Sequence, residues 1–546
     1  MKVFFVDIKL HKFLSFLDRK IKKSIWGICI LLLVSNILEL FSLSAVIPIL
    51  ADFSSSKDFD SKILDIELFK ILILSPLKIK VLVLLGLVIL KNIYQAIIQY
   101  KLSSLGYKIE STISIKLIRY FFVDKYSEKK SAELIKNCTS DAHRINMFYF
   151  IPLMIIFTDS ILVIIIISFL TYFYFRLSLT LFLIFGFSIY LYHKLTGLKI
   201  INWGKKMNIY DESRINILNE IFHNFIFIKL INKSHFFIKK FNKSNSKYIN
   251  SSYFQHSLQN VTRNFYEILI FVGFLILIIT PSTEEKIITL GVFGLSVFKL
   301  MPSLNRITSN WNSLKFSIPV LSSLQFTPSK ENESIKKIKF DSIQLKNISF
   351  QYEDSKDFII KDLNNIINKG DFVGIMGKSG AGKSTLIKIL MGFIIPTKGE
   401  ILINKKNQKS SLLKISYVPQ KVNLINDSIT NNIAFGEENI NINRVNEVIK
   451  LADLDETIGK LPNGLNTFAG ELGTKLSGGQ IQRIGIARAL YNNPELIIFD
   501  ESTNSLDEVS EKMFFNTISK LNNYLTIIFI SHNTNNHIFF SKKIYL

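Results

Sequence analysis

Long apolar runs with few charges constrain this chain more than any other feature of its sequence. Residues 25–50 and 151–174, for example, are long enough to cross a hydrocarbon layer about 30 Å thick. Segments of this kind lie at about 25–50, 79–100, 146–174, 177–195, 264–280 and 286–305. We therefore predict a membrane α-helical bundle of six transmembrane helices, with both ends of the bundle on one side.

The formal net charge of +23 follows the connections between these segments. Lysine and arginine are frequent in residues 101–144 and 196–263, and the other connections are short and poor in cations, so the loop rule makes the two long connections cytoplasmic. Connections of this length with helical patterning predict membrane helices that extend into the cytoplasm. No zinc, RNA-binding or helix-turn-helix pattern accompanies the charge, so nucleic-acid binding is not expected.

A change of composition divides the chain. Residues 327–339 are polar and rich in charge, and beyond them strand-like and helix-like segments alternate with short turns that contain glycine. The pattern predicts a transmembrane domain over 1–326, a linker over 327–339, and an α/β domain over 340–546.

The first motif of the α/β domain follows the apolar strand 372–376 and precedes a helix-like run at 386–391. Its glycines allow backbone N–H groups to surround phosphates at the N-terminus of the helix. Lys383 is expected to contact the β- and γ-phosphates and Ser384 to bind Mg²⁺. The motif makes ATP and Mg²⁺ the expected cofactors, bound by Gly377, Lys378, Ser379, Gly380, Ala381, Gly382, Lys383, Ser384 and Thr385.

A second motif is the apolar run 496–499 followed by Asp500 and Glu501. An acidic pair at a strand end is often only a solvated turn. Downstream of a phosphate loop, it suits a Mg²⁺-associated Asp500 and a Glu501 that accepts a proton from the attacking water.

The segment Leu476-Ser-Gly-Gly-Gln480 resembles the signature sequence of ABC ATPases. The resemblance implies that Tyr352 stacks on adenine, that Gln420 is a metal ligand and senses the cytoplasmic helices, and that His532 is the switch histidine. Residues 469–473 resemble the stretch by which exporters of this family contact those helices. The implied catalytic residues are Glu501, His532, Gln420 and Lys383, the implied metal ligands are Ser384, Gln420 and Asp500, and the signature residues at the nucleotide are Ser477, Gly478, Gly479 and Gln480.

In this family two ATP-binding domains enclose two nucleotides, so the resemblance implies a second copy of the chain as partner. Ser477 and Gly479 of one chain would complete the site formed by Lys383 and Glu501 of the other. The expected assembly is a homodimer with composite ATP sites.

Residues 290–306 resemble the sixth helix of bacterial lipid-linked oligosaccharide flippases, and Glu267 and residues 45–50 are similar to that subgroup too. The resemblance implies transport of a lipid-linked oligosaccharide or glycolipid across the bacterial inner membrane, with the ATP-binding domain in the cytoplasm. An exporter of peptides, drugs or other lipids is the alternative. A non-transporting relative is a third possibility, against which Glu501 and His532 argue.

Several charged residues fall within or beside the expected spans: Glu39, Lys91, Asp159, Lys299 and Arg306. Lys299 and Arg306 lie about two helical turns apart, on nearly the same face, and a phosphate or pyrophosphate headgroup could bind there. The alternatives are that each such residue faces a neighbouring helix, a water-filled cavity or, by snorkelling, the interface, or that Lys299 and Arg306 only mark the cytoplasmic end of their helix.

Overall fold

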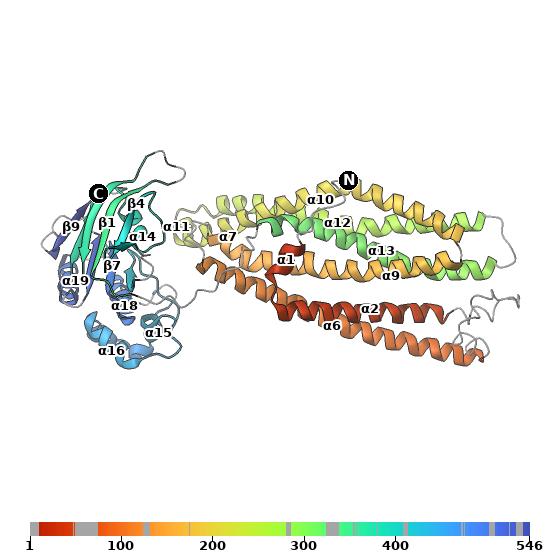
Figure 1. Ribbon diagram of the computed structural model, residues 1–546, viewed down its shortest axis with the longest axis horizontal. Coiled ribbons are helices and arrows are strands. Elements are labelled where there is room, and N and C mark those ends of the chain that lie inside the picture. The colour runs from red at the N-terminus through yellow and green to blue at the C-terminus, as the bar shows by residue number, and fades with distance from the viewer. Residues whose placement is uncertain are drawn as a thin grey trace. The chain divides into compact units, whose positions relative to one another are not determined.

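The computed structural model describes two compact units, Met1–Lys330 and Glu331–Leu546 (Figure 1). The described residues are 10–46, 49, 75–123, 131–173, 175–279, 286–323, 338–352, 355, 357–378, 380–407, 413–470, 473, 476–501, 508–522, 525–530 and 539–546. The division falls within the expected linker 327–339. The limits of that linker stay a prediction, because residues 324–337 lie outside the described ranges.

The first unit is helical. Its elements are α1 (Leu10–Phe16), α2 (Arg19–Ser44), α6 (Leu77–Val123), α7 (Ser131–Lys136), η1 (Asn137–Asp141), α8 (Ala142–Ile145), η2 (Asn146–Phe150), α9 (Ile151–Phe173), α10 (Phe175–His223), α11 (Phe225–Leu230), α12 (Ser234–Ile279) and α13 (Lys286–Ser323). The helices α6, α10, α12 and α13 have 47, 49, 46 and 38 residues. Because about 20 residues span a bilayer, each of these helices is longer than one crossing requires.

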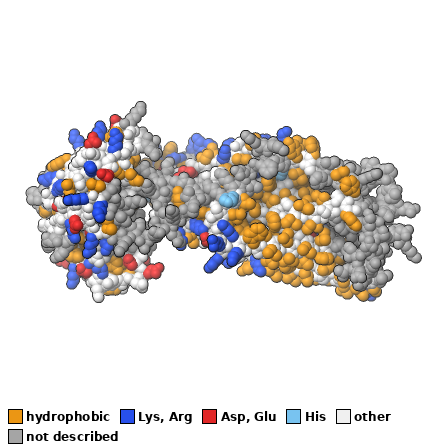
Figure 2. Space-filling model, in the orientation of Figure 1, with side chains coloured by type: hydrophobic (Ala, Val, Ile, Leu, Met, Phe, Trp, Pro, Cys, Tyr) orange, Lys and Arg blue, Asp and Glu red, His pale blue; other side chains and the backbone are white. Residues whose placement is uncertain are grey.

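Three stretches of the described residues are long and apolar enough to cross a membrane: Arg19–Ser42, Leu77–Phe122 and Ala132–Tyr172. Apolar side chains cover a broad band of this unit's surface (Figure 2). Trp26 and Leu82, for example, are 72% and 65% exposed, an arrangement suited to contact with lipid. The count of six spans stays a prediction.

The helices of this unit pack in a few close pairs. Helix α10 contacts α12 and α13, α9 contacts α13, and α2 contacts α6. Ile109, Ile113, Ile145 and Tyr149 are almost completely buried between α6 and the α8–η2 segment. Residues of α2, α6, α9 and α13 line one cavity of this unit.

The second unit contains two sheets. Strands β1 (Ser342–Phe350), β2 (Ile360–Asn368), β4 (Lys398–Ile403) and β5 (Lys406–Asn407) form an antiparallel sheet in the order β2-β1-β4-β5. Strands β3 (Phe372–Met376), β6 (Ile415–Val418), β7 (Leu496–Asp500), β8 (Thr526–Ile530) and β9 (Lys542–Tyr545) form a parallel sheet in the order β6-β7-β8-β3-β9. The carboxyl ends of the parallel strands therefore meet at one edge, where ligands bind in sheets of this kind.

Alternate side chains of the parallel strands enter two cores. Phe372 and Phe499 pack on the side of α15 (Ile429–Ala434), α16 (Ile442–Leu451), α18 (Gly478–Tyr491) and α19 (Glu508–Leu521). Val373 and Ile498 pack on the opposite side with α14 (Lys383–Leu390) and the antiparallel sheet. The short α17 (Asp455–Gly459) and η4 (Gly464–Asn466) complete the helical side. Burial on both faces explains why these strands are continuous apolar runs.

Candidate functional site: a nucleotide site and a charged membrane cavity

The phosphate loop connects the fully buried strand β3 to helix α14. Gly382 caps the helix with a φ of +94°, in the left-handed region that favours glycine. A Cβ atom at Gly382 would lie 2.7 Å from Cγ2 of Ile359, so the position also lacks room for a side chain. The loop thus needs a glycine where its backbone turns into the helix.

The side chain of Lys383 is buried beneath this loop. Its Nζ donates to the carbonyl oxygens of Gly377 at 2.9 Å and of Lys378 at 3.2 Å. These bonds hold the ammonium group inside the curve of the loop, where phosphate oxygens could replace the carbonyls. The next residue, Ser384, is exposed at the first turn of α14.

Tyr352 lies beside the same helix. Its hydroxyl is 3.3 Å from Oγ1 of Thr385, and its ring meets that of Phe350 edge-on at 4.9 Å between centroids. The phenol is half-buried. The expected adenine contact of Tyr352 stays a prediction.

The carboxyl edge of the parallel sheet brings together three of the expected residues. Asp500 ends β7, Glu501 follows it, and Gln420 lies just after the neighbouring strand β6. The Nε2 of Gln420 donates to Oε2 of Glu501 at 3.0 Å. Glu501 has a φ of +48°, an unfavourable conformation for a side chain other than glycine, as is common at functional sites.

Tyr417 is a residue of this edge that the sequence analysis did not identify. Its hydroxyl donates to Oδ2 of Asp500 at 2.8 Å. Tyr417 lies three positions before Gln420, on strand β6, which pairs with β7. This closeness to Gln420 in the sequence was the signal by which Tyr417 could have been identified as a residue of the site.

Burial raises the pKa of Asp500 above its ordinary value, and the negative charge of Glu501 raises it further. The hydrogen bond from Tyr417 and the charge of Lys383 act in the opposite direction. A cation at this edge would favour the ionised carboxylate. The hydroxyl of Ser384, the amide oxygen of Gln420 and the carboxylate of Asp500 are all oxygen donors, which suits Mg²⁺.

The signature segment begins helix α18. Ser477 is its N-cap: the hydroxyl accepts from the backbone N–H of Gln480, and Oε1 of Gln480 accepts from the backbone N–H of Ser477 at 2.9 Å. This capping box fixes the helix start and leaves Ser477 and Gly478 exposed, with Gly479 beside them. The N-terminus of α18 is therefore ordered and open to an anion from outside the unit.

Two expected site residues, Ser379 and His532, lie outside the described residues. Their roles, like the other residue roles inferred from the resemblance, stay predictions.

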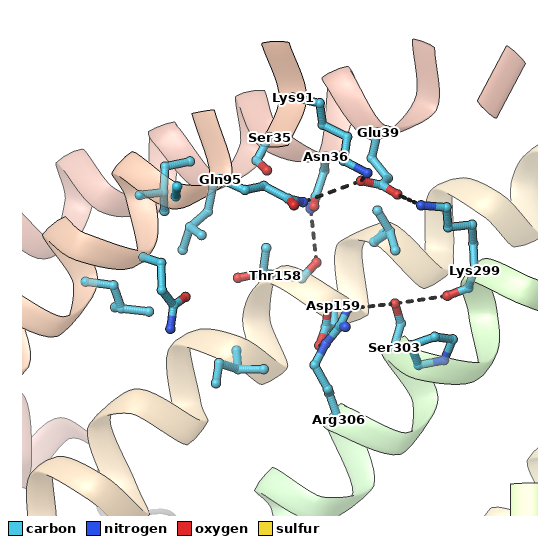
Figure 3. A pocket seen from close by; sticks show the side chains of 18 of the residues that line it. Ser35, Asn36, Glu39, Lys91, Gln95, Thr158, Asp159, Lys299, Ser303 and Arg306 are labelled. Carbon is cyan, nitrogen blue, oxygen red and sulfur yellow. Dashed lines mark hydrogen bonds and ion pairs between the residues drawn. The ribbon is translucent and has the colours of Figure 1, made fainter. Parts of the chain in front are cut away.

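The charged residues of the expected spans lie together around a cavity of about 610 Å³ bounded by α2, α6, α9 and α13 (Figure 3). Glu39 pairs with Lys91 at 2.7 Å and with Lys299 at 2.5 Å, and Asp159 pairs with Arg306 at 2.8 Å. Lys299 and Arg306 thus form no unopposed cationic stripe, because each contacts a carboxylate on a neighbouring helix.

Comparisons with known proteins agree with this geometry. Residues 360–504 match the ABC transporter family. An export ATP-binding/permease protein of Rickettsia prowazekii is 43% identical over 199 residues, which cover 35% of this chain and 34% of that protein. The toxin RTX-III translocation ATP-binding protein of Actinobacillus pleuropneumoniae is 38% identical over 244 residues, 44% of this chain and 32% of that protein. The chain thus spans about a third of the length of these relatives.

The whole fold has a solved counterpart. A bacterial Atm1-family ABC exporter with ATP bound superposes with a TM-score of 0.75 and 19% identity, over 97% of this chain and 94% of that one. Domains of the matched family use ATP with Mg²⁺. Residues 360–504 therefore resemble the ABC transporter family, and the chain has the fold of a bacterial ABC exporter.

Proposed function

We propose that this chain is one half of an ATP-driven exporter, that it works as a homodimer, and that it resides in the bacterial inner membrane with its ATP-binding domain in the cytoplasm. The observation that carries the proposal is the exporter fold itself, which covers nearly the whole chain and joins a helical membrane unit to one ATP-binding domain. Helices such as α10, with 49 residues, are long enough to leave the bilayer and to transmit motion between the membrane unit and the ATP-binding domain.

In this proposal the phosphate loop and Lys383 bind the β- and γ-phosphates, and Ser384, Gln420 and Asp500 hold Mg²⁺. When bound, Mg²⁺ neutralises negative charge on the phosphates. Glu501 accepts a proton from the attacking water. Its hydrogen bond from Gln420 holds the carboxylate in place before the nucleotide arrives.

The signature residues act on the partner's nucleotide. Ser477 and Gly479 stand at an ordered helix start, and the capping box ties the Ser477 hydroxyl to α18 itself. The γ-phosphate of a nucleotide bound to the second copy would accept hydrogen bonds from the backbone N–H groups at this helix N-terminus. Tyr352 and His532 act in the other composite site, the one built on this chain's own phosphate loop, at the adenine and at the γ-phosphate.

The proposed cargo is a lipid-linked oligosaccharide or a glycolipid. The alternative is a peptide, a drug or another lipid, and relatives such as the alpha-hemolysin translocation ATP-binding protein of Escherichia coli O157:H7, 40% identical over 195 residues, keep peptide export open. The apolar outer surface and the polar cavity within the membrane unit support an amphiphilic cargo.

The test is Mg²⁺-dependent ATP hydrolysis by the reconstituted chain and by Glu501→Gln. The amide keeps the shape of Glu501 but cannot accept the proton, so turnover should fall by at least about a hundredfold while ATP binding persists. Lys240→Gln, which removes an exposed lysine–glutamate pair of the membrane unit, is the control and should hydrolyse ATP normally. Undiminished turnover in Glu501→Gln would remove this residue from catalysis, and a parent without ATPase activity would refute the exporter.

Cargo is tested separately, by ATP-dependent movement of a fluorescent lipid-linked glycan or of a peptide across the membrane of sealed vesicles. Movement of the glycan alone would support the flippase, and movement of the peptide alone would replace it by the alternative.

A further inference from the structure

The cavity of the membrane unit has two kinds of wall (Figure 3). One kind is apolar and includes Leu32, Ile98, Leu162 and Phe298. The other is polar, and its charged members come from all four surrounding helices. A cavity of about 610 Å³ with such walls has the size and character of a site for a small amphiphile.

The charges of this cavity do not cancel. Of the described residues that line it, Glu39 and Asp159 are acidic, and Lys91, Lys299 and Arg306 are basic. Glu39 is shared by two lysines, whereas Asp159 is engaged by Arg306 through a bidentate pair with both N···O distances at 2.8 Å. With all five groups ionised, the cluster carries one excess positive charge.

The excess charge is accessible on one helix. The side chains of Glu39, Lys91 and Asp159 are only 8% or 9% exposed, but those of Lys299 and Arg306 on α13 are 30% and 50% exposed. Ser303 lies between them and accepts from Nη2 of Arg306 at 3.2 Å. Among the residues that the structure describes, Nη1 of Arg306 takes no part in a hydrogen bond, so a donor remains for a ligand.

We propose that this cavity binds an amphiphile whose headgroup carries a single negative charge, such as a phosphodiester, between Lys299 and Arg306. Glu39 and Asp159 hold these cations in place, and a monoanion brings the cluster to neutrality. A diphosphate headgroup would leave surplus negative charge beside the buried carboxylates of Glu39 and Asp159, which is unfavourable. As an assignment of cargo the inference rests on the proposed exporter function, but binding itself requires no ATP.

The ligand chemistry can be tested without nucleotide, by native mass spectrometry of the full chain in an uncharged detergent. The probes are dodecyl methyl phosphate, dodecyl diphosphate, dodecyltrimethylammonium and the tailless dimethyl phosphate. We expect the phosphodiester with a tail to bind most tightly. Lys299→Gln and Arg306→Gln should each weaken it by about tenfold or more, the loss expected for one charge-assisted hydrogen bond. The control variant Lys240→Gln should bind like the parent.

Asp159→Asn tests the charge count directly. It raises the net charge of the cluster by one, so the ratio of diphosphate to phosphodiester affinity should increase, and a ratio is insensitive to a partly unfolded sample. The proposal is overturned if Asp159→Asn has the same affinity ratio as the parent. It is also overturned if the parent binds dodecyl diphosphate or dodecyltrimethylammonium more tightly than dodecyl methyl phosphate. If the parent binds dimethyl phosphate as tightly as dodecyl methyl phosphate, the inference that the ligand is an amphiphile is overturned. Failure of these tests in a chain that still hydrolyses ATP leaves the exporter function intact, and lost ATPase activity with intact binding refutes only the exporter.

Discussion

Replacing Gly382 by alanine should damage the phosphate loop more than the same change at Gly380. Both glycines have a left-handed φ, +94° and +82°, so alanine incurs a backbone cost of about 1–2 kcal/mol at either position. Only at Gly382 would the new Cβ meet other atoms, Cγ2 of Ile359 at 2.7 Å and Cγ1 of Ile360 at 3.2 Å, whereas nothing lies within 4 Å at Gly380. Crowding of this kind adds about 1–3 kcal/mol.

The difference between the two variants isolates the crowding, because their effects on the unfolded chain are the same. In a domain of about 150–250 residues, 1 kcal/mol lowers the melting temperature by about 2–4 °C. Gly382→Ala should thus melt about 2–12 °C below Gly380→Ala in thermal unfolding of the full chain, followed at the transition that added Mg²⁺-ATP shifts upward. Binding of a fluorescent ATP analogue should also be weaker in Gly382→Ala. Equal melting temperatures, or stronger nucleotide binding by Gly382→Ala, would refute the reasoning.

Two further substitutions test the ATP-binding domain. Tyr417→Phe removes the hydrogen bond that lowers the pKa of Asp500, so this pKa, already raised by burial, should rise further. The acid limb of the pH profile of ATPase activity, measured at subsaturating Mg²⁺, should therefore move to higher pH. An acid limb that stays in place or moves to lower pH would contradict this prediction. Gly485→Ala places a Cβ 2.6 Å from Cγ2 of Val422 and should destabilise the domain by about 1–3 kcal/mol, despite a helix-propensity gain of about 1 kcal/mol. Val422→Ala in the same chain should recover part of that loss, and the absence of any recovery in the melting temperature would refute the contact.

The arrangement of the candidate nucleotide site was predictable because its signals are local. A buried strand, a glycine loop and a helix start follow one another in the sequence, and the parallel order of β6 and β7 then places Gln420 beside Glu501. The contact of Tyr417 with Asp500 was not predictable, because an aromatic residue on a strand does not reveal which neighbouring side chain its hydroxyl reaches.

The membrane unit shows the same limit more strongly. Periodicity places Lys299 and Arg306 on one face of α13, but it does not reveal which helices that face meets. The pairing of Lys299 with Glu39 joins residues 260 positions apart, and that of Arg306 with Asp159 joins residues 147 apart. Helix packing, which the sequence pattern does not specify, turns an expected cationic stripe into an ion-paired cavity.

The composite ATP site is the central claim, and it is tested most directly by the ATPase activity of a defined heterodimer of Lys383→Ala and Ser477→Ala chains, isolated through two different affinity tags. If each site combines Lys383 of one chain with Ser477 of the other, both changes fall in one site and the second site stays intact. The heterodimer should then hydrolyse ATP measurably, whereas each mutant homodimer should be nearly inactive. A heterodimer as inactive as the mutant homodimers would contradict the account, because sites that each lay within one chain would both be damaged.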